Sequence, residues 1–127
     1  MVKIDLTYAG GLHCEATHGP SGRTLETDAP VDNHGKGESF SPTDLAATAL
    51  GACMATIMGI YAESHGIDLK GMKLSVSKEM TPSPPRRIAR ITTEIWLPAG
   101  VKPNPALEAA AKSCPVHLSL HPEVEKP

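Results

Sequence analysis

The feature that most constrains the fold of this chain is one long helix rich in small side chains. Its start combines Ser41, which can cap a helix, Pro42, which suits the first helical position, and Asp44, an acidic residue in the first turn. Apolar residues then recur at helical spacing as far as Gly66, which suits the C-terminal cap. The first half of the helix carries the small residues Ala46, Ala47, Ala49, Gly51, Ala52 and Ala55. Small side chains let a second helix approach closely, so we expect this helix to be buried against a partner helix.

Segments of alternating apolar and polar residues flank the helix, and this period is typical of half-buried strands. The alternation predicts strands at residues 2–8, 12–17, 23–27, 72–77 and 91–97. Turns rich in Gly and Pro separate them, which favours a meander before the helix and a hairpin with a Pro-rich tip after it. A second helix is predicted from residue 105 to about 113, whereas residues 116–120 fit either a strand or a helical turn. The chain is therefore predicted to be a single α+β domain over residues 1–127.

The composition limits both the core and the partners. Aromatic residues are few, with one Trp, two Tyr and one Phe in 127 residues, and an isolated monomer with so few large rings is expected to be marginal. The formal net charge is −2, and without a basic surplus we expect no nucleic-acid partner. No stretch approaches the roughly 20 apolar residues that span a bilayer, and the N-terminus lacks a signal-peptide pattern. These features predict a cytoplasmic protein with no membrane partner.

Three cysteines, Cys14, Cys53 and Cys114, are the residues with the richest chemistry. An odd number without zinc-finger spacing, in a reducing compartment, is compatible with buried thiols, metal ligands or redox-active groups. A cysteine on an apolar helix face, as Cys53 is, is more often an inert core residue than a nucleophile. Cys14 follows His13 on a short predicted strand and is more readily explained by packing than by catalysis.

Three short motifs distinguish between these possibilities. They are Ser-Pro-Thr-Asp-Leu at 41–45, Ala-Leu-Gly-Ala-Cys at 49–53 and Cys-Pro-Val-His at 114–117. Together they resemble the OsmC/Ohr family of osmotically induced and organic-hydroperoxide-resistance proteins, and the resemblance extends over nearly the whole chain and to the order of its elements. It implies an OsmC-like α+β fold in an intertwined homodimer, with the two long helices packed at its centre.

The resemblance also implies a thiol-dependent peroxidase. In the peroxidase members the first cysteine attacks the peroxide and the second resolves the product, and these roles carry over to Cys53 and Cys114. Cys53 would become a sulfenic acid on reaction with an organic hydroperoxide and then form a disulfide with Cys114, which an external dithiol reductant would reduce. No cofactor and no metal ion are implied.

This chain departs from the family pattern at the residues that would activate the thiolate. The helix dipole fades beyond the first turn, so a nearby positive charge must activate a thiolate at Cys53. The hydroperoxide-resistance branch usually has an Arg after the early Gly-Gly and a Glu after the Pro that opens the helix, but these positions hold Leu12 and Thr43. The candidate substitutes are the cation Arg23, the carboxylates Glu38 and Asp44, and His13. A strand-face Arg in water and an Asp that serves only the helix dipole are equally compatible with the sequence.

Two other classes of function stay open. A metal ion could use imidazole and sulfur ligands from His13, Cys14, Cys53, Cys114 and His117, although their spacing fits no structural zinc pattern. A non-enzymatic dimer could instead hold a small apolar ligand in a pocket lined by Met54 and Met58. Other charged residues are expected to be solvated: the turn histidines His18, His34, His65 and His121, and the strand-end arginines Arg86, Arg87 and Arg90.

Overall fold

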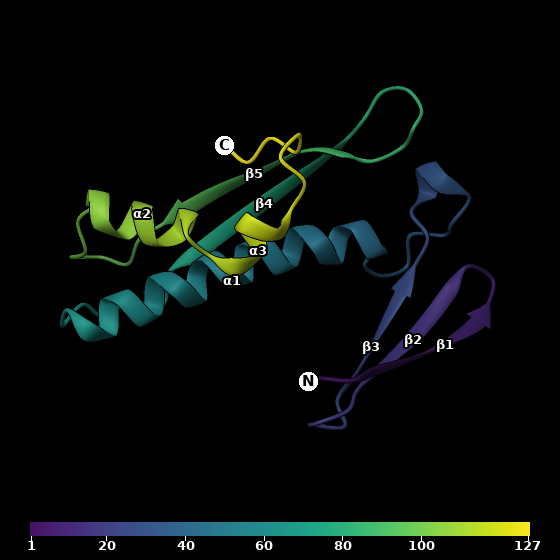
Figure 1. Ribbon diagram of the computed structural model, residues 1–127, viewed down its shortest axis with the longest axis horizontal. Helices are drawn as coiled ribbons and strands as arrows, with labels where there is room; N and C mark the ends of the chain where they lie inside the picture. Colours follow the sequence, from purple (N-terminus) through teal and green to yellow (C-terminus); the bar gives the residue numbers. More distant parts are fainter. The chain divides into compact units, whose positions relative to one another are not determined.

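The computed structural model describes residues 1–127, which separate into two compact units, Met1–Leu45 and Ala46–Pro127. The first unit holds a three-stranded sheet and the second a two-stranded sheet with helices (Figure 1). The order of elements is meander, long helix, hairpin and second helix, as predicted, so the α+β class is confirmed. That the two units form a single domain stays a prediction.

The first unit is an antiparallel meander of β1 (Ile4–Gly10), β2 (His13–His18) and β3 (Thr24–Asp28). A short 3-10 turn, η1 (Val31–Asn33), follows. β1 begins later than predicted because Ile4 pairs with His18, the last residue of β2, and no strand lies opposite the residues before it. The register determines which side chains share a face of the sheet.

One face of this meander carries large apolar side chains that the first unit itself leaves exposed. The register puts Ile4, Leu6 and Tyr8 of β1 on the same face as Leu25 of β3. All four are exposed, by 47 to 65%. We call these four residues the apolar face of the meander. Among the side chains directly opposite them, only Ala16 is buried.

The long helix α1 (Pro42–Ser64) begins and ends where the sequence indicates. At its start, Asp44 donates its backbone N–H to Ser41 Oγ at 3.0 Å, and Ser41 donates its own N–H back to Asp44 Oδ2 at 2.9 Å. This reciprocal pair is a capping box and satisfies two N–H groups that the helix leaves without partners. At its end, Gly66 has φ of +68° and Ile67 donates its N–H to the Ala62 carbonyl at 2.9 Å, which forms a Schellman motif.

In the second unit, α1 packs on the hairpin of β4 (Lys73–Met80) and β5 (Ile88–Trp96) (Figure 1). A Cβ added at Gly51 would lie 2.7 Å from Val76 Cγ2, so Gly51 is needed for the close approach of α1 to β4. Gly51 thus contacts the hairpin, and the expected packing of α1 against a partner helix stays a prediction. The exposed stripe of α1, consisting of Ala49, Ala52, Thr56 and Ile60, is the face still open to a partner.

Two short helices and the C-terminal tail complete the second unit. The helix α2 (Pro105–Lys112) is capped by Asn104, whose Oδ1 accepts from the Leu107 N–H at 2.9 Å. The segment that fits either a strand or a helical turn is α3 (Pro115–Ser119). The tail runs parallel to β5, with Ile91 donating its N–H to the Glu125 carbonyl at 2.8 Å.

The basic strand end is tied to this tail through ion pairs. Arg90 pairs with Glu125 and, at 3.6 Å, with Glu79, while Arg87 lies 3.5 Å from Glu123. These arginines neutralise neighbouring carboxylates on an exposed strand end, in line with the prediction that they are solvated. Their contribution to stability is expected to be small, because exposed ion pairs are worth about 0–1 kcal/mol.

The core of the second unit has two parts along α1. One cluster joins Leu50 of α1 to Ile91 of β5 and includes Cys114 and Val124. The other joins Met58 of α1 to Leu107 and Ala111 of α2. Large apolar side chains from the helix, the hairpin and the tail thus meet inside this unit.

By length and composition alone, α1 could cross a membrane, with a mean hydropathy of 1.7. The expectation that no stretch approaches a membrane span is therefore wrong on this measure. The core helix of a soluble protein meets the same measure, so one such helix is weak evidence for a membrane location. Only 28% of the apolar window is buried within the chain, which leaves much of the helix surface open for other contacts.

Candidate cysteine site

The structure brings together two of the three cysteines. Cys53 lies in the middle of α1 and packs, half-buried, against the core cluster that contains the fully buried Cys114. The Cys53 side chain lies close enough to Cys114 to raise the pKa of its thiol, and both thiols are free. Two thiols in direct contact can be joined in a disulfide after one of them is oxidised.

The position of Cys114 follows from the break between α2 and α3. Pro115 opens α3, and the residue before a proline is restricted to extended backbone, which Cys114 adopts with φ of −66° and ψ of 144°. Cys114 is the N-cap of α3, and its Sγ accepts from the His117 N–H at 3.3 Å. The side chain is therefore held in one direction by the backbone of the next helix.

Burial raises the pKa of the Cys114 thiol. The backbone N–H of His117 opposes this shift, whereas the hydrogen bond and negative charge of Cys53 raise the pKa further. Cys114 is thus a neutral thiol at physiological pH, and its S–H can donate toward the sulfur of Cys53. The two cysteines differ in burial, since Cys53 is half-buried and Cys114 is fully buried.

The predicted activating residues all lie in the first unit, whereas the two cysteines lie in the second. Arg23 stands in the turn before β3 and is exposed, not on the strand as predicted, and its carbonyl accepts from the His18 N–H at 2.8 Å. Glu38 donates its backbone N–H to Asp28 at 3.0 Å, and Asp44 belongs to the capping box of α1. A role for any of them in activating Cys53 stays a prediction.

The two positions where the family pattern is missing have local structural roles. Leu12 is a non-glycine residue with φ of +62°, and its carbonyl accepts from the Ala29 N–H at 3.1 Å. Thr43 Oγ1 lies 3.2 Å from Ser41 Oγ at the start of α1. Leu12 thus shapes the turn between β1 and β2, and Thr43 adds to the helix start.

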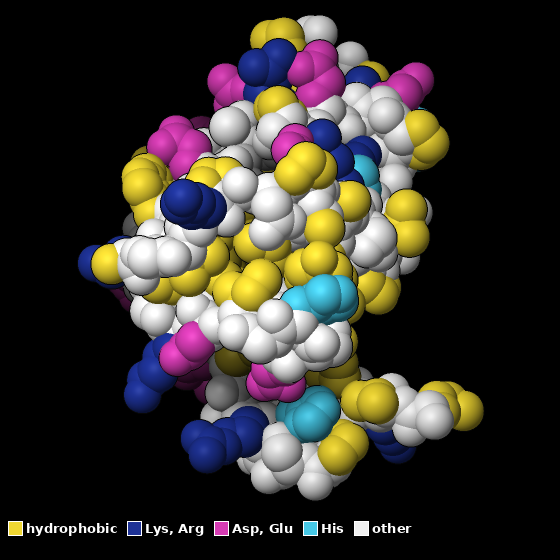
Figure 2. Space-filling view, turned by 90° about the vertical axis from the view of Figure 1, so that its left-hand side faces the viewer, with side chains coloured by type: hydrophobic (Ala, Val, Ile, Leu, Met, Phe, Trp, Pro, Cys, Tyr) yellow, Lys and Arg dark blue, Asp and Glu magenta, His cyan; other side chains and the backbone are white.

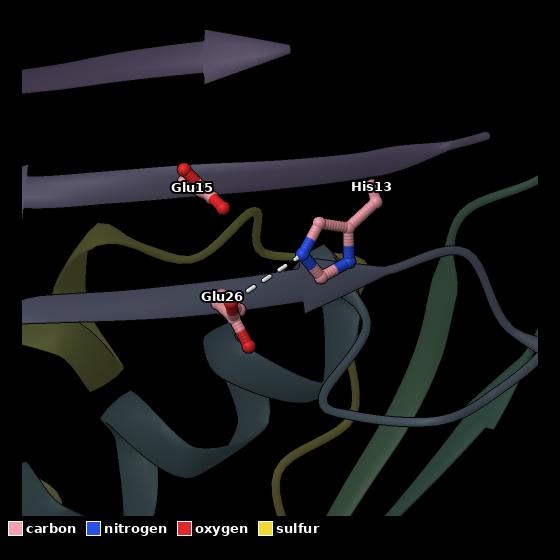
Figure 3. Close-up of side chains that lie close together, drawn as sticks. All are labelled: His13, Glu15 and Glu26. Carbon is pink, nitrogen blue, oxygen red and sulfur yellow. Dashed lines mark ion pairs between the residues drawn. The ribbon is translucent and has the colours of Figure 1, made fainter. Parts of the chain in front are cut away.

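His13 lies among carboxylates on the face of the meander opposite its apolar face (Figure 3). Glu15 is the direct cross-strand neighbour of Glu26, and His13 Nε2 is 3.7 Å from Glu26 Oε1. The ligand atoms of these three residues lie within 4.8 Å of one another, so they are the set that could hold a metal ion. The metal hypothesis that combines His13 with Cys53 and Cys114 draws its ligands from both units, and the bond between His117 and Cys114 Sγ is made by the backbone N–H of His117 and not by its imidazole.

A cavity of about 750 Å³ opens in the second unit, and neither Cys53 nor Cys114 is among the residues that line it. Met54 and Met58 line it, as the ligand-binding hypothesis expects, together with residues of β5 and α2. Sequence reasoning missed three further lining residues, Trp96, Lys112 and Lys126. No local pattern marks them, because the cavity is formed by segments that are distant in sequence.

Cys14 belongs to the first unit, whereas Cys53 and Cys114 belong to the second. It lies on β2 opposite Tyr8 and Thr27, in the first unit, and is half-buried. The structure therefore has one close pair of thiols and one separate cysteine.

Comparison with solved structures shows the same fold in several proteins. A candidate osmotic stress induced and detoxification response protein from Psychrobacter arcticus 273-4 is 40% identical, with a TM-score of 0.90 over 99% of this chain and 93% of that one. An organic hydroperoxide resistance protein OsmC from Legionella pneumophila is 18% identical, with a TM-score of 0.76 over 99% and 93% of the two chains. The organic hydroperoxide resistance protein OhrB of Bacillus subtilis is 13% identical, with a TM-score of 0.68 over 99% and 94%. No curated protein matches the sequence.

A long central helix packed on a two-stranded hairpin defines the class as an α+β protein, and one cysteine on this helix packs against a second at the start of α3. The family model described as OsmC-like protein matches residues 35–125, which is most of the chain. The chain belongs to this OsmC/Ohr family, whose solved members include proteins named for organic hydroperoxide resistance.

Proposed function

We propose that the protein is a thiol-dependent peroxidase that reduces organic hydroperoxides through Cys53 and Cys114. The observation that carries the proposal is the contact between a half-buried thiol on α1 and a fully buried thiol at the start of α3. Membership of a family with hydroperoxide-resistance proteins supports the same chemistry.

The roles of the two cysteines follow from access and protonation. A peroxide must reach the attacking sulfur, and only Cys53 is open enough for this. Cys114 is buried and keeps its proton because burial raises its pKa. It is therefore suited to react only in the second step, with the oxidised Cys53. Cys53 is therefore the peroxidatic residue and Cys114 the resolving one.

The reaction needs two steps on the protein and one in solution. The Cys53 thiolate attacks the terminal oxygen of the hydroperoxide, the O–O bond breaks, and an alcohol leaves after its alkoxide takes a proton. The sulfur of Cys114 then attacks the Cys53 sulfenic acid, which releases water and forms the disulfide. An external dithiol reduces this disulfide and is itself oxidised to a disulfide.

The activating charge belongs to this proposal as well. Arg23 is the candidate cation, with Glu38 or Asp44 to orient it. Both carboxylate residues also have structural roles. Asp44 caps α1, and the backbone N–H of Glu38 donates to Asp28.

The working unit in this proposal is a homodimer in the cytoplasm, where thiols are kept reduced. Two open surfaces support the dimer: the apolar face of the meander and the exposed stripe of α1. Exposed apolar area of this extent is uncommon on monomeric proteins and often marks an interface. A second copy would cover it.

Turnover of cumene hydroperoxide with dithiothreitol tests the proposal. We expect peroxide consumption by the natural chain, and for Cys53→Ser a rate no higher than that of dithiothreitol alone. Cys14→Ser is the matched control and is expected to keep full activity, because Cys14 has no role in the proposed reaction. Full activity of Cys53→Ser would contradict the proposal.

A second candidate function, a non-enzymatic dimer that binds a small apolar ligand, is favoured by the cavity itself. Its volume of about 750 Å³ lies within the range of small-molecule sites, and Met54 and Met58 give it adaptable walls. This candidate predicts a bound apolar ligand and no peroxide turnover.

A further inference from the structure

We propose that His13, Glu15 and Glu26 bind a divalent transition metal ion on the polar face of the meander, which is the face opposite its apolar face. The three side chains come from the neighbouring strands β2 and β3 (Figure 3). The site lies wholly within the first unit and uses no cysteine. It is therefore independent of the proposed peroxide turnover.

The register of the sheet places the three side chains close together. His13 and Glu15 are two residues apart on β2 and so share a face, and Glu15 lies directly opposite Glu26. Their ligand atoms all lie within 4.8 Å of one another. Two atoms bound to one tetrahedral Zn²⁺ at about 2.1 Å are about 3.4 Å apart. His13 Nε2 lies 3.7 Å from Glu26 Oε1, so this pair is already close to the spacing that a metal ion requires.

The two carboxylates of this set have no basic partner other than the imidazole. Glu15 and Glu26 are both exposed, and like charges directly opposite one another destabilise a sheet. Glu26 pairs with His13, and neither carboxylate pairs with a Lys or Arg. In the second unit, by contrast, Arg90 pairs with Glu125. Figure 2 shows Lys and Arg side chains close to Asp and Glu side chains toward the top of the view, where the hairpin lies. A divalent ion would supply the missing positive charge on the meander.

A third carboxylate orients the imidazole. The side chain of Asp28 is only 5% exposed, and its Oδ1 lies 3.9 Å from His13 Nδ1. Its other oxygen, Oδ2, accepts from the Glu38 backbone N–H at 3.0 Å, which fixes the carboxylate. Metal-binding histidines usually have such a carboxylate at the second ring nitrogen, because it selects the tautomer that leaves the first nitrogen free to coordinate. Nδ1 of His13 thus faces the buried Asp28, while Nε2 faces Glu26.

The donor atoms determine which kind of ion the site would prefer. Imidazole nitrogen suits Zn²⁺ and other divalent transition metals, whereas Mg²⁺ and Ca²⁺ prefer sites made of oxygen alone. One nitrogen and two carboxylates are three protein ligands, so at least one position is left for water, unlike in a closed structural zinc site. We therefore use Zn²⁺ as the probe and Mg²⁺ as the comparison.

Isothermal titration calorimetry of the full chain with Zn²⁺ tests the site, in a phosphine reductant that keeps the thiols reduced. We expect one equivalent to bind at a site that Cys53→Ser and Cys114→Ser both retain, and Mg²⁺ to bind there at least tenfold more weakly. Loss of the site in either cysteine variant would assign the zinc to the thiols and overturn the proposal. The absence of Zn²⁺ binding would also overturn it, and neither result bears on peroxide turnover.

Variants test the assigned ligands. His13→Gln and Glu15→Gln are each expected to raise the Kd for Zn²⁺ at least tenfold. His18→Gln is the matched control and should leave the Kd unchanged, because His18 lies on the same strand but on the opposite face of the sheet. An unchanged Kd in His13→Gln would overturn the proposal.

A measurement on the natural chain does not depend on how these variants fold. In nuclear magnetic resonance spectra, one equivalent of Zn²⁺ should shift the ring resonances of His13 and leave those of His18 in place. Ring resonances of His13 that do not respond to Zn²⁺ would overturn the proposal.

Discussion

The two units of the chain differ in where their apolar side chains are placed. The second unit packs its own core, with Leu50 and Ile91 at 1% and 0% exposure between helix and hairpin. The first unit is a three-stranded meander whose large apolar side chains are exposed on one face. The second unit thus buries its large apolar side chains within itself, whereas the first unit leaves its apolar face exposed.

The largest effect is expected in the core of the second unit. Ile91→Ala removes a fully buried side chain at the centre of the first core cluster and should lower the free energy of unfolding by about 2–5 kcal/mol. Leu6→Ala, on the apolar face of the meander, is the comparison and should cost less than about 0.5 kcal/mol in monomers. Chemical denaturation at low protein concentration measures both. Equal losses would show that the two units do not differ in this way.

The next effect concerns the exposed face itself. Leu6→Ser with Leu25→Ser removes two side chains that a second copy would bury, each worth about 1.5–3 kcal/mol when fully covered. We expect sedimentation velocity to show a dimer that dissociates more readily in this variant. Val31→Ser alters an apolar residue outside this face and is the control. If the natural chain sediments as a monomer at every concentration, the proposed dimer is wrong.

A smaller effect tests the close packing of α1 on β4. Gly51→Ala would place a Cβ 2.7 Å from Val76 Cγ2, and overpacking of this kind typically costs about 1–3 kcal/mol. Val76→Ala in the same chain should recover part of the loss. The matched control is Gly59→Ala, also in α1 but with open space around it, which should stabilise by about 0.5–1 kcal/mol. Thermal unfolding of the four variants measures the coupling, and additive effects at 51 and 76 would contradict the contact.

The smallest effect is a pH dependence at His117. Burial lowers the pKa of His117, with Lys126 and Lys112 lowering it further, so the folded chain takes up this proton at lower pH than the unfolded chain does. The resulting stability is present above the unfolded pKa, near pH 6.5, and is lost as the pH falls through the folded pKa. His117→Gln should therefore lose less stability than the natural chain between pH 7 and pH 5. His34→Asn, on an exposed loop, should behave as the natural chain does.

Local patterns in the sequence were enough to predict most of the fold. The period-2 alternation located all five strands to within a few residues, and Ser41, Asp44 and Gly66 marked the ends of α1. Strand ends depend on what lies opposite, as Ile4 does on His18, and this is not visible in the strand's own residues. The segment that became α3 is too short for its period to distinguish a strand from a helix.

Less of the candidate site than of the fold could be predicted from the sequence. Nothing in the spacing of Cys53 and Cys114 indicates that they touch, and only the family resemblance paired them. The contact depends on the break at Pro115, which turns Cys114 back toward α1. The lysines at the cavity, Lys112 and Lys126, come together only because the tail returns along β5.

The central claim is that Cys53 and Cys114 form a working redox pair. One equivalent of cumene hydroperoxide is added to the reduced chain, and mass spectrometry of its peptides then reports the state of each cysteine. A Cys53–Cys114 disulfide is expected in the natural chain, and in Cys114→Ser a sulfenic acid at Cys53 that dimedone traps. Cys14 should stay reduced in both. A disulfide that includes Cys14, or oxidation of Cys114 with Cys53 left reduced, would contradict the account.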